Sequence, residues 1–78
     1  MKPLIIANWK LNPSSQKEAT HLFESVKKSI GHYKNASVVI CPPFVYLPLL
    51  KGLTLGAQNV FYKETGAFTG QVSPKMLT

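Results

Sequence analysis

The sequence predicts an α/β protein with a parallel sheet, built from about three strand–helix units. Apolar runs at Leu4–Ala7 and Ser37–Cys41 are typical of strands that are buried on both faces. Between them, apolar residues recur at helical spacing and would form one stripe facing the sheet: Ala19, Leu22, Phe23, Val26 and Ile30. The order of strand, helix and strand is that of a βαβ unit, which gives a parallel sheet.

The first helix has a start signal and a stop signal. Ser15 with Glu18 forms a possible capping box, in which the serine side chain accepts from the backbone N–H three residues later. Lys27 and Lys28 suit the negative end of the helix dipole, and Gly31 is a reasonable stop.

The second and third strands are placed by prolines and glycines. Ser37–Cys41 is ended by Pro42 and Pro43, which cannot donate to a strand ladder. Leu53–Ala57 is predicted to be the third strand. The connection from Pro42 to Gly52 is close to the lower limit of about 10–12 residues for a βαβ crossover, with Pro48 in the first turn of a short helix.

Composition excludes several classes of protein. The 78 residues are 45% hydrophobic and 15% charged, which is ordinary for a globular piece, and they include a single cysteine. An internal disulfide is therefore excluded, and we expect no metal site because no Cys/His cluster exists. The apolar runs are shorter than the roughly 18 residues of a membrane span, and no signal peptide is evident, so we expect a cytoplasmic protein without a membrane partner.

The net charge of +6 raises the possibility of an anionic partner. All nine basic residues are lysines, spread along the chain, and arginine is absent. Since arginine is the residue best suited to bidentate contacts with guanine and phosphate, and no nucleic-acid-binding motif is evident, we expect no nucleic-acid partner. A basic module that binds another anion remains an alternative.

Polar side chains follow the first strand. Strand alternation places Leu4, Ile6, Asn8 and Lys10 on one face. The carboxyl end of a parallel strand is where α/β folds bind ligands, so Lys10 would offer a positive charge to an anion. The alternative is that Lys10 simply extends into solvent.

Four segments together resemble the triosephosphate isomerase family, in the family's order: Ala7–Asn12, Val39–Phe44, Gly56–Val60 and Gly66–Gly70. The resemblance covers the whole chain and corresponds to the first third or so of a (β/α)8 TIM barrel, which takes about 250 residues. It implies that residues 1–78 are the N-terminal fragment of a single TIM-barrel domain. Ser73 and Pro74 would begin a third helix, which is truncated at Thr78.

The resemblance implies an isomerase of glycolysis and gluconeogenesis, which interconverts dihydroxyacetone phosphate and glyceraldehyde 3-phosphate through an enediolate, without a cofactor. Lys10 would be catalytic and substrate-binding, and Asn8 substrate-binding. The family's glutamate base, histidine electrophile and phosphate loops belong to later segments, so we expect the chain alone to be inactive. A non-catalytic interaction fragment is the other alternative.

The segment Val60–Val72 is too apolar for a simple exposed loop, because it contains Phe61, Tyr62 and Phe68. In the family this loop docks into the other subunit of a homodimer, which would place Phe68 and Thr69 in the dimer interface. The alternative is that its aromatic residues fold back on their own domain.

Two departures from the family pattern are evident, and the remaining polar residues are weaker candidates. Gln71 stands where the family usually has glutamate, and the second crossover is several residues shorter than in the family.

Cys41 is predicted to be a buried small hydrophobe. Gln58 and Asn59 are predicted to organise hydrogen bonds around the site. Surface or packing roles are predicted for the others: Glu18, His21, Glu24, His32 and Glu64.

Overall fold

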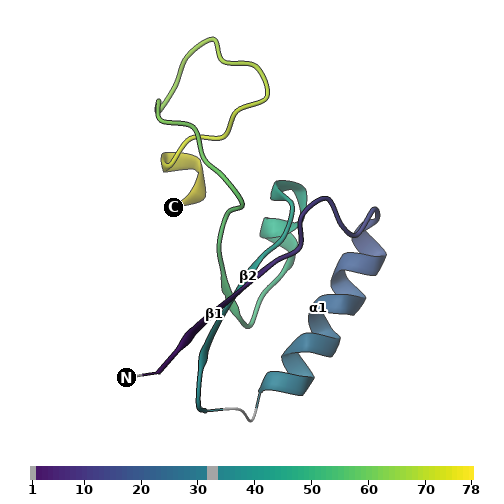
Figure 1. The fold of residues 1–78 in the computed structure, drawn as a ribbon. Helices are drawn as coiled ribbons and strands as arrows, with labels where there is room; N and C mark the ends of the chain where they lie inside the picture. Colours follow the sequence, from purple (N-terminus) through teal and green to yellow (C-terminus); the bar gives the residue numbers. More distant parts are fainter. Residues whose placement is uncertain (1, 32–33) are drawn as a thin grey trace.

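The computed structural model describes residues 2–31 and 34–78. Its elements are β1 (Leu4–Asn8), α1 (Gln16–Ile30), β2 (Ser37–Cys41), the 3-10 helix η1 (Phe44–Leu49), β3 (Thr54–Leu55) and the 3-10 helix η2 (Lys75–Leu77). The strands pair in parallel in the order β1-β2-β3, and α1 runs along one face of the sheet (Figure 1). The predicted α/β class and parallel sheet are confirmed.

Helix α1 begins as its sequence predicts. The Ser15 side-chain oxygen accepts a hydrogen bond from the Glu18 backbone N–H at 3.1 Å, so Ser15 is the N-cap. Lys27 and Lys28 lie in the last turn, near the negative end of the helix dipole. The helix ends at Ile30, and Gly31 has a right-handed φ of −58°, so this end does not use a left-handed glycine.

The core lies between α1 and the sheet. Ala19 and Phe23 of α1 are almost fully buried against Ile40 of β2, and Tyr46 and Leu50 close the cluster from η1 and the residue after it. The Tyr46 hydroxyl donates to the Pro13 carbonyl at 2.9 Å, which ties η1 to the loop before α1. Another expected member of the apolar stripe, Leu22, is 41% exposed and lies at the border of the stripe.

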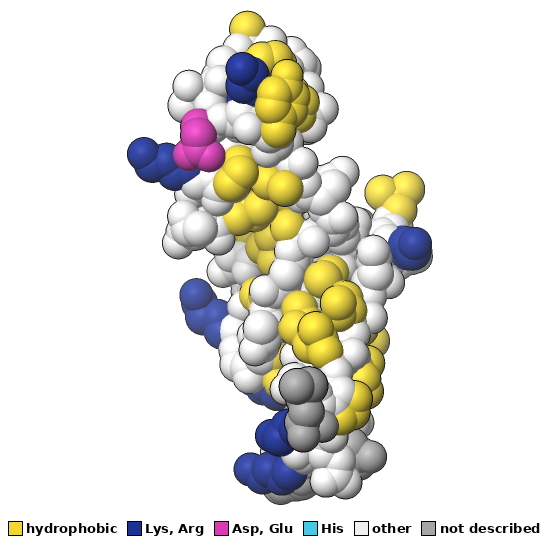
Figure 2. Space-filling model, turned by 60° about the vertical axis from the view of Figure 1, so that its left-hand side comes forward, with side chains coloured by type: hydrophobic (Ala, Val, Ile, Leu, Met, Phe, Trp, Pro, Cys, Tyr) yellow, Lys and Arg dark blue, Asp and Glu magenta, His cyan; other side chains and the backbone are white. Residues whose placement is uncertain are grey.

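Strand β1 is not buried on both faces, contrary to the sequence prediction. Leu4, Ile5 and Ile6 are 61%, 51% and 60% exposed. Ala7 packs against the core cluster, and so does Trp9 just after the strand. The face of β1 that carries these odd-numbered residues is therefore the one that faces α1. By alternation Ile6 and Asn8 face the other side, which no described element covers (Figure 1). Figure 2 shows hydrophobic side chains exposed along one side of the molecule. The prediction failed because β1 is an edge strand and only one face of the sheet is covered.

The connection from β2 to β3 differs from its prediction. The only helical element is η1, and Pro48 lies near its end instead of in its first turn. Since proline cannot donate a helical hydrogen bond and β3 begins soon after, no room is left for a longer helix. Strand β3 is shorter than predicted, although the Gly56 N–H still donates to the Ile40 carbonyl at 2.9 Å.

The remaining residues form a separate lobe that extends away from the sheet (Figure 1). The Phe61 N–H donates to the Val72 carbonyl at 2.8 Å and closes a long loop. The buried Ser73 side chain accepts from the Met76 N–H at 3.3 Å, which confirms Ser73 as a helix start, although only the short η2 follows. None of the described helices is long and apolar enough to cross a membrane.

Candidate functional site

Asn8 and Lys10 form a tight turn where β1 ends. The Asn8 side-chain oxygen accepts a hydrogen bond from the Lys10 backbone N–H at 2.8 Å, an Asx-type turn. Lys10 has a φ of +58°, which places it in the left-handed region. The strand alternation that predicted a shared face for Asn8 and Lys10 therefore does not extend to Lys10. The two residues are brought together by the turn instead.

The conformation of Lys10 is unusual for its residue type. A lysine in the left-handed region costs about 1–3 kcal/mol, and such residues persist only where their surroundings hold them. Gln58 helps to stabilise this conformation, because its side-chain amide donates to the Lys10 carbonyl at 2.9 Å. Asn8 also stabilises it, because its side-chain oxygen accepts from the Lys10 backbone N–H. A lysine that merely extends into solvent needs neither contact, so this arrangement favours a functional role for Lys10.

Gln58 connects the carboxyl ends of all three strands. It follows β3, and its amide nitrogen also donates to the Cys41 carbonyl, the last of β2, at 2.9 Å. The same carbonyl accepts from the Trp9 N–H at 3.0 Å, just past the end of β1. The prediction that Gln58 organises hydrogen bonds around the site is confirmed. Asn59 is exposed and takes no part in this network among the described residues.

Close packing accompanies this network. Cys41 is 7% exposed, as predicted for a small buried hydrophobe. A Cβ atom on Gly56 would lie 2.9 Å from the Cys41 sulfur and 3.2 Å from a Val39 methyl group. A larger residue just past β3 would therefore have to displace the Cys41 and Val39 side chains of the neighbouring strand.

The electrostatics of the site leave the Lys10 ammonium available. Lys10 and Asn8 are both exposed. Within residues 2–31 and 34–78, the one ion pair joins Lys27 to Glu24 at 3.1 Å, and none involves Lys10. Asn8 uses its side-chain oxygen on the backbone, which leaves its amide nitrogen as the donor for a ligand oxygen. The pair can therefore offer an ammonium and an amide N–H to an oxyanion.

The other polar candidates lie elsewhere. His21 is exposed on α1, Glu64 is exposed in the long loop, and His32 lies outside the described residues. The described residues contain no group of three His, Cys, Asp or Glu side chains that could hold a metal ion. The sequence did not predict the left-handed Lys10, although an asparagine two residues earlier is a signal for such a turn.

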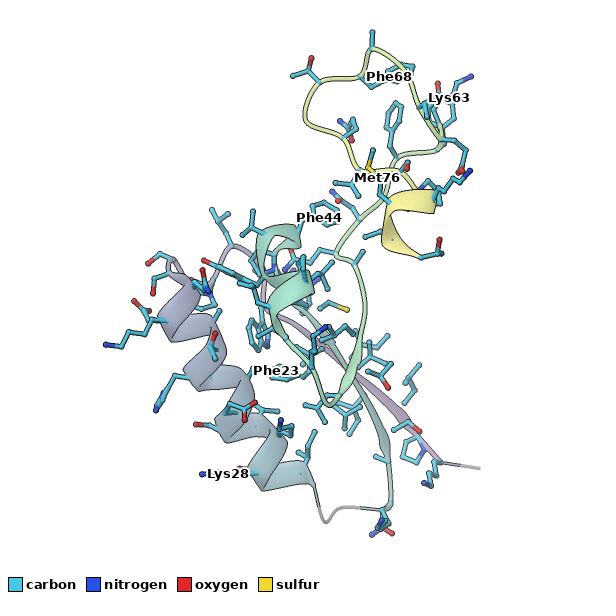
Figure 3. The ribbon with its side chains drawn as sticks, turned by 180° about the vertical axis from the view of Figure 1, so that it is seen from behind. Phe23, Lys28, Phe44, Lys63, Phe68 and Met76 are labelled. Carbon is cyan, nitrogen blue, oxygen red and sulfur yellow. The ribbon has the colours of Figure 1, made fainter. Side chains whose placement is uncertain are left out.

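The long loop carries its own aromatic cluster. The Phe61 ring centroid is 4.7 Å from that of Tyr62 and 4.7 Å from that of Phe68. A Cβ on Gly66, with φ of +142°, would lie 2.5 Å from the Phe68 ring. Figure 3 shows Phe68 in the lobe, well away from Phe23 in the core. The aromatic residues thus pack on one another and not on the sheet, while Tyr62 and Phe68 stay 75% and 43% exposed.

Comparison with known proteins gives a consistent result. A family model described as triosephosphate isomerase matches residues 3–78. A triosephosphate isomerase of Nitrosococcus oceani is 43% identical over 96% of this chain and 32% of its own length. Those of Dehalococcoides mccartyi strain BAV1 and Methylococcus capsulatus are 43% and 45% identical, over 99% and 97% of this chain and 33% and 32% of their own lengths. The chain spans about a third of the length of these relatives.

The alignments also bear on the short crossover. The alignment with the Dehalococcoides mccartyi protein runs over 84 positions, although the present chain has 78 residues. Several residues of that relative therefore have no counterpart here. That these residues fall in the crossover that contains η1 stays a prediction.

The Gln58 network gives the first testable prediction. We define the completed chain as these 78 residues joined to the remaining two thirds of the Dehalococcoides mccartyi relative. In it, Gln58→Met should lower the free energy of unfolding by about 1–3 kcal/mol, because the Lys10 carbonyl loses the side-chain amide that donates to it and the Cys41 carbonyl loses one of its two donors. Urea titration measures this. The control Gln16→Met makes the same change on an exposed helix residue; equal stability of the two variants would refute the role of Gln58.

Proposed function

The chain belongs to the triosephosphate isomerase family, and we propose that the complete protein containing it interconverts dihydroxyacetone phosphate and glyceraldehyde 3-phosphate. The observation that supports this most is the turn at the end of β1, where a left-handed Lys10 is held between Asn8 and Gln58. The turn fixes the backbone from which an exposed ammonium extends at the ligand-binding end of a parallel sheet.

The chemistry of the reaction fits these residues. Removing a proton next to the substrate carbonyl produces an enediolate, whose negative charge develops in the transition state. A preorganised ammonium stabilises such charge, and the Lys10 ammonium can also attract the substrate phosphate. The Asn8 amide donates to a substrate oxygen. We therefore propose that Lys10 is catalytic and substrate-binding, and that Asn8 is substrate-binding.

The base is the missing part of this site. Glu24 is paired with Lys27 on α1, and the other carboxylates, Glu18 and Glu64, lie at the start of α1 and in the long loop. None of them is on a strand end. A positioned base contributes about 10²–10⁴-fold to such a reaction, so we propose that the 78-residue chain is inactive alone. We further propose that the complete protein needs no cofactor and works in glycolysis and gluconeogenesis in the cytoplasm.

The long loop suits assembly of a homodimer. Its aromatic residues remain partly exposed after packing on one another, and exposing them costs free energy unless a partner covers them. We propose that Phe68 and the exposed Thr69 enter the interface with a second subunit. Gln71, also exposed, cannot form the ion pair that a glutamate would form there, so that contact is weaker in this protein.

The role of Lys10 is tested by substitution. In the completed chain, Lys10→Ala should lower kcat by at least about a hundredfold, because it removes a charge that acts on the transition state. A coupled isomerase assay measures this, with Lys17→Ala on α1 as the control lysine. An unchanged kcat with a higher KM would show that Lys10 serves only uniform binding. The isolated 78-residue chain is assayed in the same way. Turnover by this chain that disappears in its Lys10→Ala variant would overturn the claim that the chain is inactive alone.

The role of the loop is tested by the oligomeric state. Thr69→Glu in the completed chain should shift the protein toward monomers, because a dimer would bury an unpaired carboxylate. Sedimentation velocity measures the shift, and Thr20→Glu on exposed α1 is the control with the same change. A Thr69→Glu variant that sediments as the same dimer as the control would place Thr69 outside the interface.

A further inference from the structure

Lysines gather at the end of the molecule opposite the candidate site. Because the strands are parallel, Lys2, Lys34 and Lys51 precede β1, β2 and β3 at the same end of the sheet. Helix α1 runs back to that end and contributes Lys27 and Lys28 in its last turn. We call these five residues the amino-end pole. All but Lys27, which is partly buried, are exposed.

The charge of the amino-end pole is poorly balanced. Its one acidic neighbour among the described residues is Glu24, which is paired with Lys27 at 3.1 Å. The other two acidic residues of the chain, Glu18 and Glu64, lie in the first turn of α1 and in the long loop. Five lysines and one glutamate leave four positive charges uncompensated. Figure 2 shows lysine side chains, and no acidic ones, at the lower end of the visible face.

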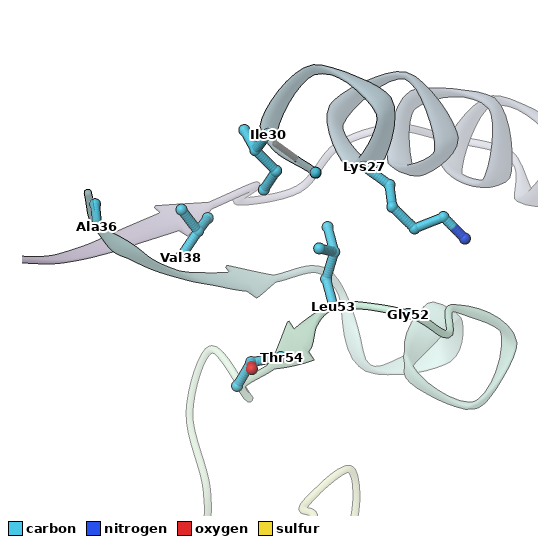
Figure 4. A pocket seen from close by; sticks show the side chains of 8 residues that line it. Lys27, Ile30, Ala36, Val38, Gly52, Leu53 and Thr54 are labelled. Atoms are coloured by element: carbon cyan, nitrogen blue, oxygen red, sulfur yellow. The ribbon is translucent and has the colours of Figure 1, made fainter. Parts of the chain in front are cut away.

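A polar hollow lies within this pole. It has a volume of about 610 Å³ and opens between the end of α1 and the starts of β2 and β3 (Figure 4). Its lining is more polar than apolar, because Lys27 and Thr54 contribute polar side chains and Gly31 and Gly52 contribute only backbone. A hollow of this volume can hold a small ligand, and this lining suits a ligand that is itself polar.

The lysines of the pole surround this hollow. Pro3 accepts a hydrogen bond on its carbonyl from the Ser37 N–H at 2.9 Å, which brings Lys2 to the start of β2. Lys27 lines the hollow itself. Each of the other pole residues is close in the sequence to a lining residue: Lys28 to Ile30, Lys34 to Ala36 and Lys51 to Gly52. The positive charges therefore gather around one small volume.

Contacts of Lys27 hold the walls of the hollow together. Its ammonium donates to the Lys51 carbonyl at 3.4 Å, which ties the end of α1 to the turn before β3. Its side chain also lies 2.9 Å from where a Cβ on Gly52 would be, and Gly52 has a φ of +113°. Helix η1 ends at Leu49, and none of its residues lines the hollow. The hollow is thus formed without a ligand and left open by the short crossover.

We propose that this hollow binds a short chain of linked phosphates, either free or as the phosphate tail of a nucleotide. Lysine ammoniums bind phosphates as point charges, and a positive potential raises the local concentration of such an anion. The carbonyls at the end of α1 oppose this with roughly half an elementary charge. That is small against four uncompensated lysines. The proposal does not depend on the isomerase activity, because Lys10 lies at the other end of the strands.

A nucleic-acid strand is the main alternative occupant. Such a strand binds along an extended basic track and stacks its bases on aromatic side chains. The lysines of the pole gather around one hollow instead, which favours a compact anion. Tyr33 directly precedes Lys34 in the sequence and lies outside the described residues, so a test of stacking has to include it.

Isothermal titration calorimetry measures the binding of inorganic tripolyphosphate. The protein is the completed chain carrying Lys10→Ala, so that the candidate site contributes no lysine charge. Tripolyphosphate should bind at least about tenfold more tightly than inorganic phosphate, because it meets several lysines at once. Lys34→Gln/Lys51→Gln should weaken its binding at least about tenfold. The control Lys17→Gln/Lys63→Gln removes the same charge elsewhere and should weaken binding by no more than about twofold.

Further measurements locate the ligand and identify its source. On adding tripolyphosphate, the NMR signals of the Gly31 and Gly52 amides should shift, and that of Gln58 should not. Ala36→Trp should weaken binding by filling the hollow while the lysines stay in place, and circular dichroism verifies that this variant folds. ATP is titrated in parallel. Affinity equal to that of tripolyphosphate identifies the phosphate chain as the ligand, and tighter binding identifies a nucleotide.

Four outcomes would overturn the proposal. The first is an equal effect of the two double variants, and the second is an amide shift confined to the carboxyl ends of the strands. The third is undiminished binding by a folded Ala36→Trp variant. The fourth is tighter binding of single-stranded DNA than of tripolyphosphate, lost in Tyr33→Ala, which would assign the pole to nucleic acid. Because binding is measured without Lys10, this proposal and the proposed function fail separately.

Discussion

The parallel pairing of β1, β2 and β3 is the constraint on which the rest of the molecule depends. Its register places Asn8 opposite Cys41, and the next strand continues to Gln58. Three carboxyl ends therefore meet, and the Gln58 side chain donates to the Cys41 carbonyl at the end of β2 and to the Lys10 carbonyl just past β1, both at 2.9 Å. The same parallel order brings the amino ends of the strands together at the opposite edge of the sheet.

The core stabilises only one side of this sheet. Phe23 and Ile40 are buried between α1 and β2, whereas β1, which carries the site, is an edge strand with exposed leucine and isoleucine side chains. An open edge and an uncovered apolar face favour association with further chain, and closed barrels avoid both. In relatives of about three times this length, the additional two thirds can supply that cover. The site is therefore organised at the end of a strand of which only one face is covered.

Local signals in the sequence predicted local structure well. Ser15 and Ser73 act as helix starts, and Ser37–Cys41 is a strand with the predicted ends, because capping and proline effects involve only neighbouring residues. Asn8 and Lys10 could be singled out from the end of an apolar run. The prediction that β1 is buried on both faces was wrong, because burial depends on the elements that cover the strand. The prediction that Pro48 lies in a first helical turn was wrong, because the length of the connection overrides this preference of proline. The left-handed Lys10 depends on Gln58, which lies far away in the sequence.

The central claim is that β1, the strand leading into the Asn8–Lys10 turn, depends for its stability on cover that these 78 residues do not supply. Amide hydrogen exchange of Leu4–Asn8, compared between the isolated chain and the completed chain, tests it most directly. We predict exchange close to that of an unfolded peptide in the isolated chain, and at least about a hundredfold slower exchange in the completed chain. Equal, strong protection of these amides in both chains would contradict the account.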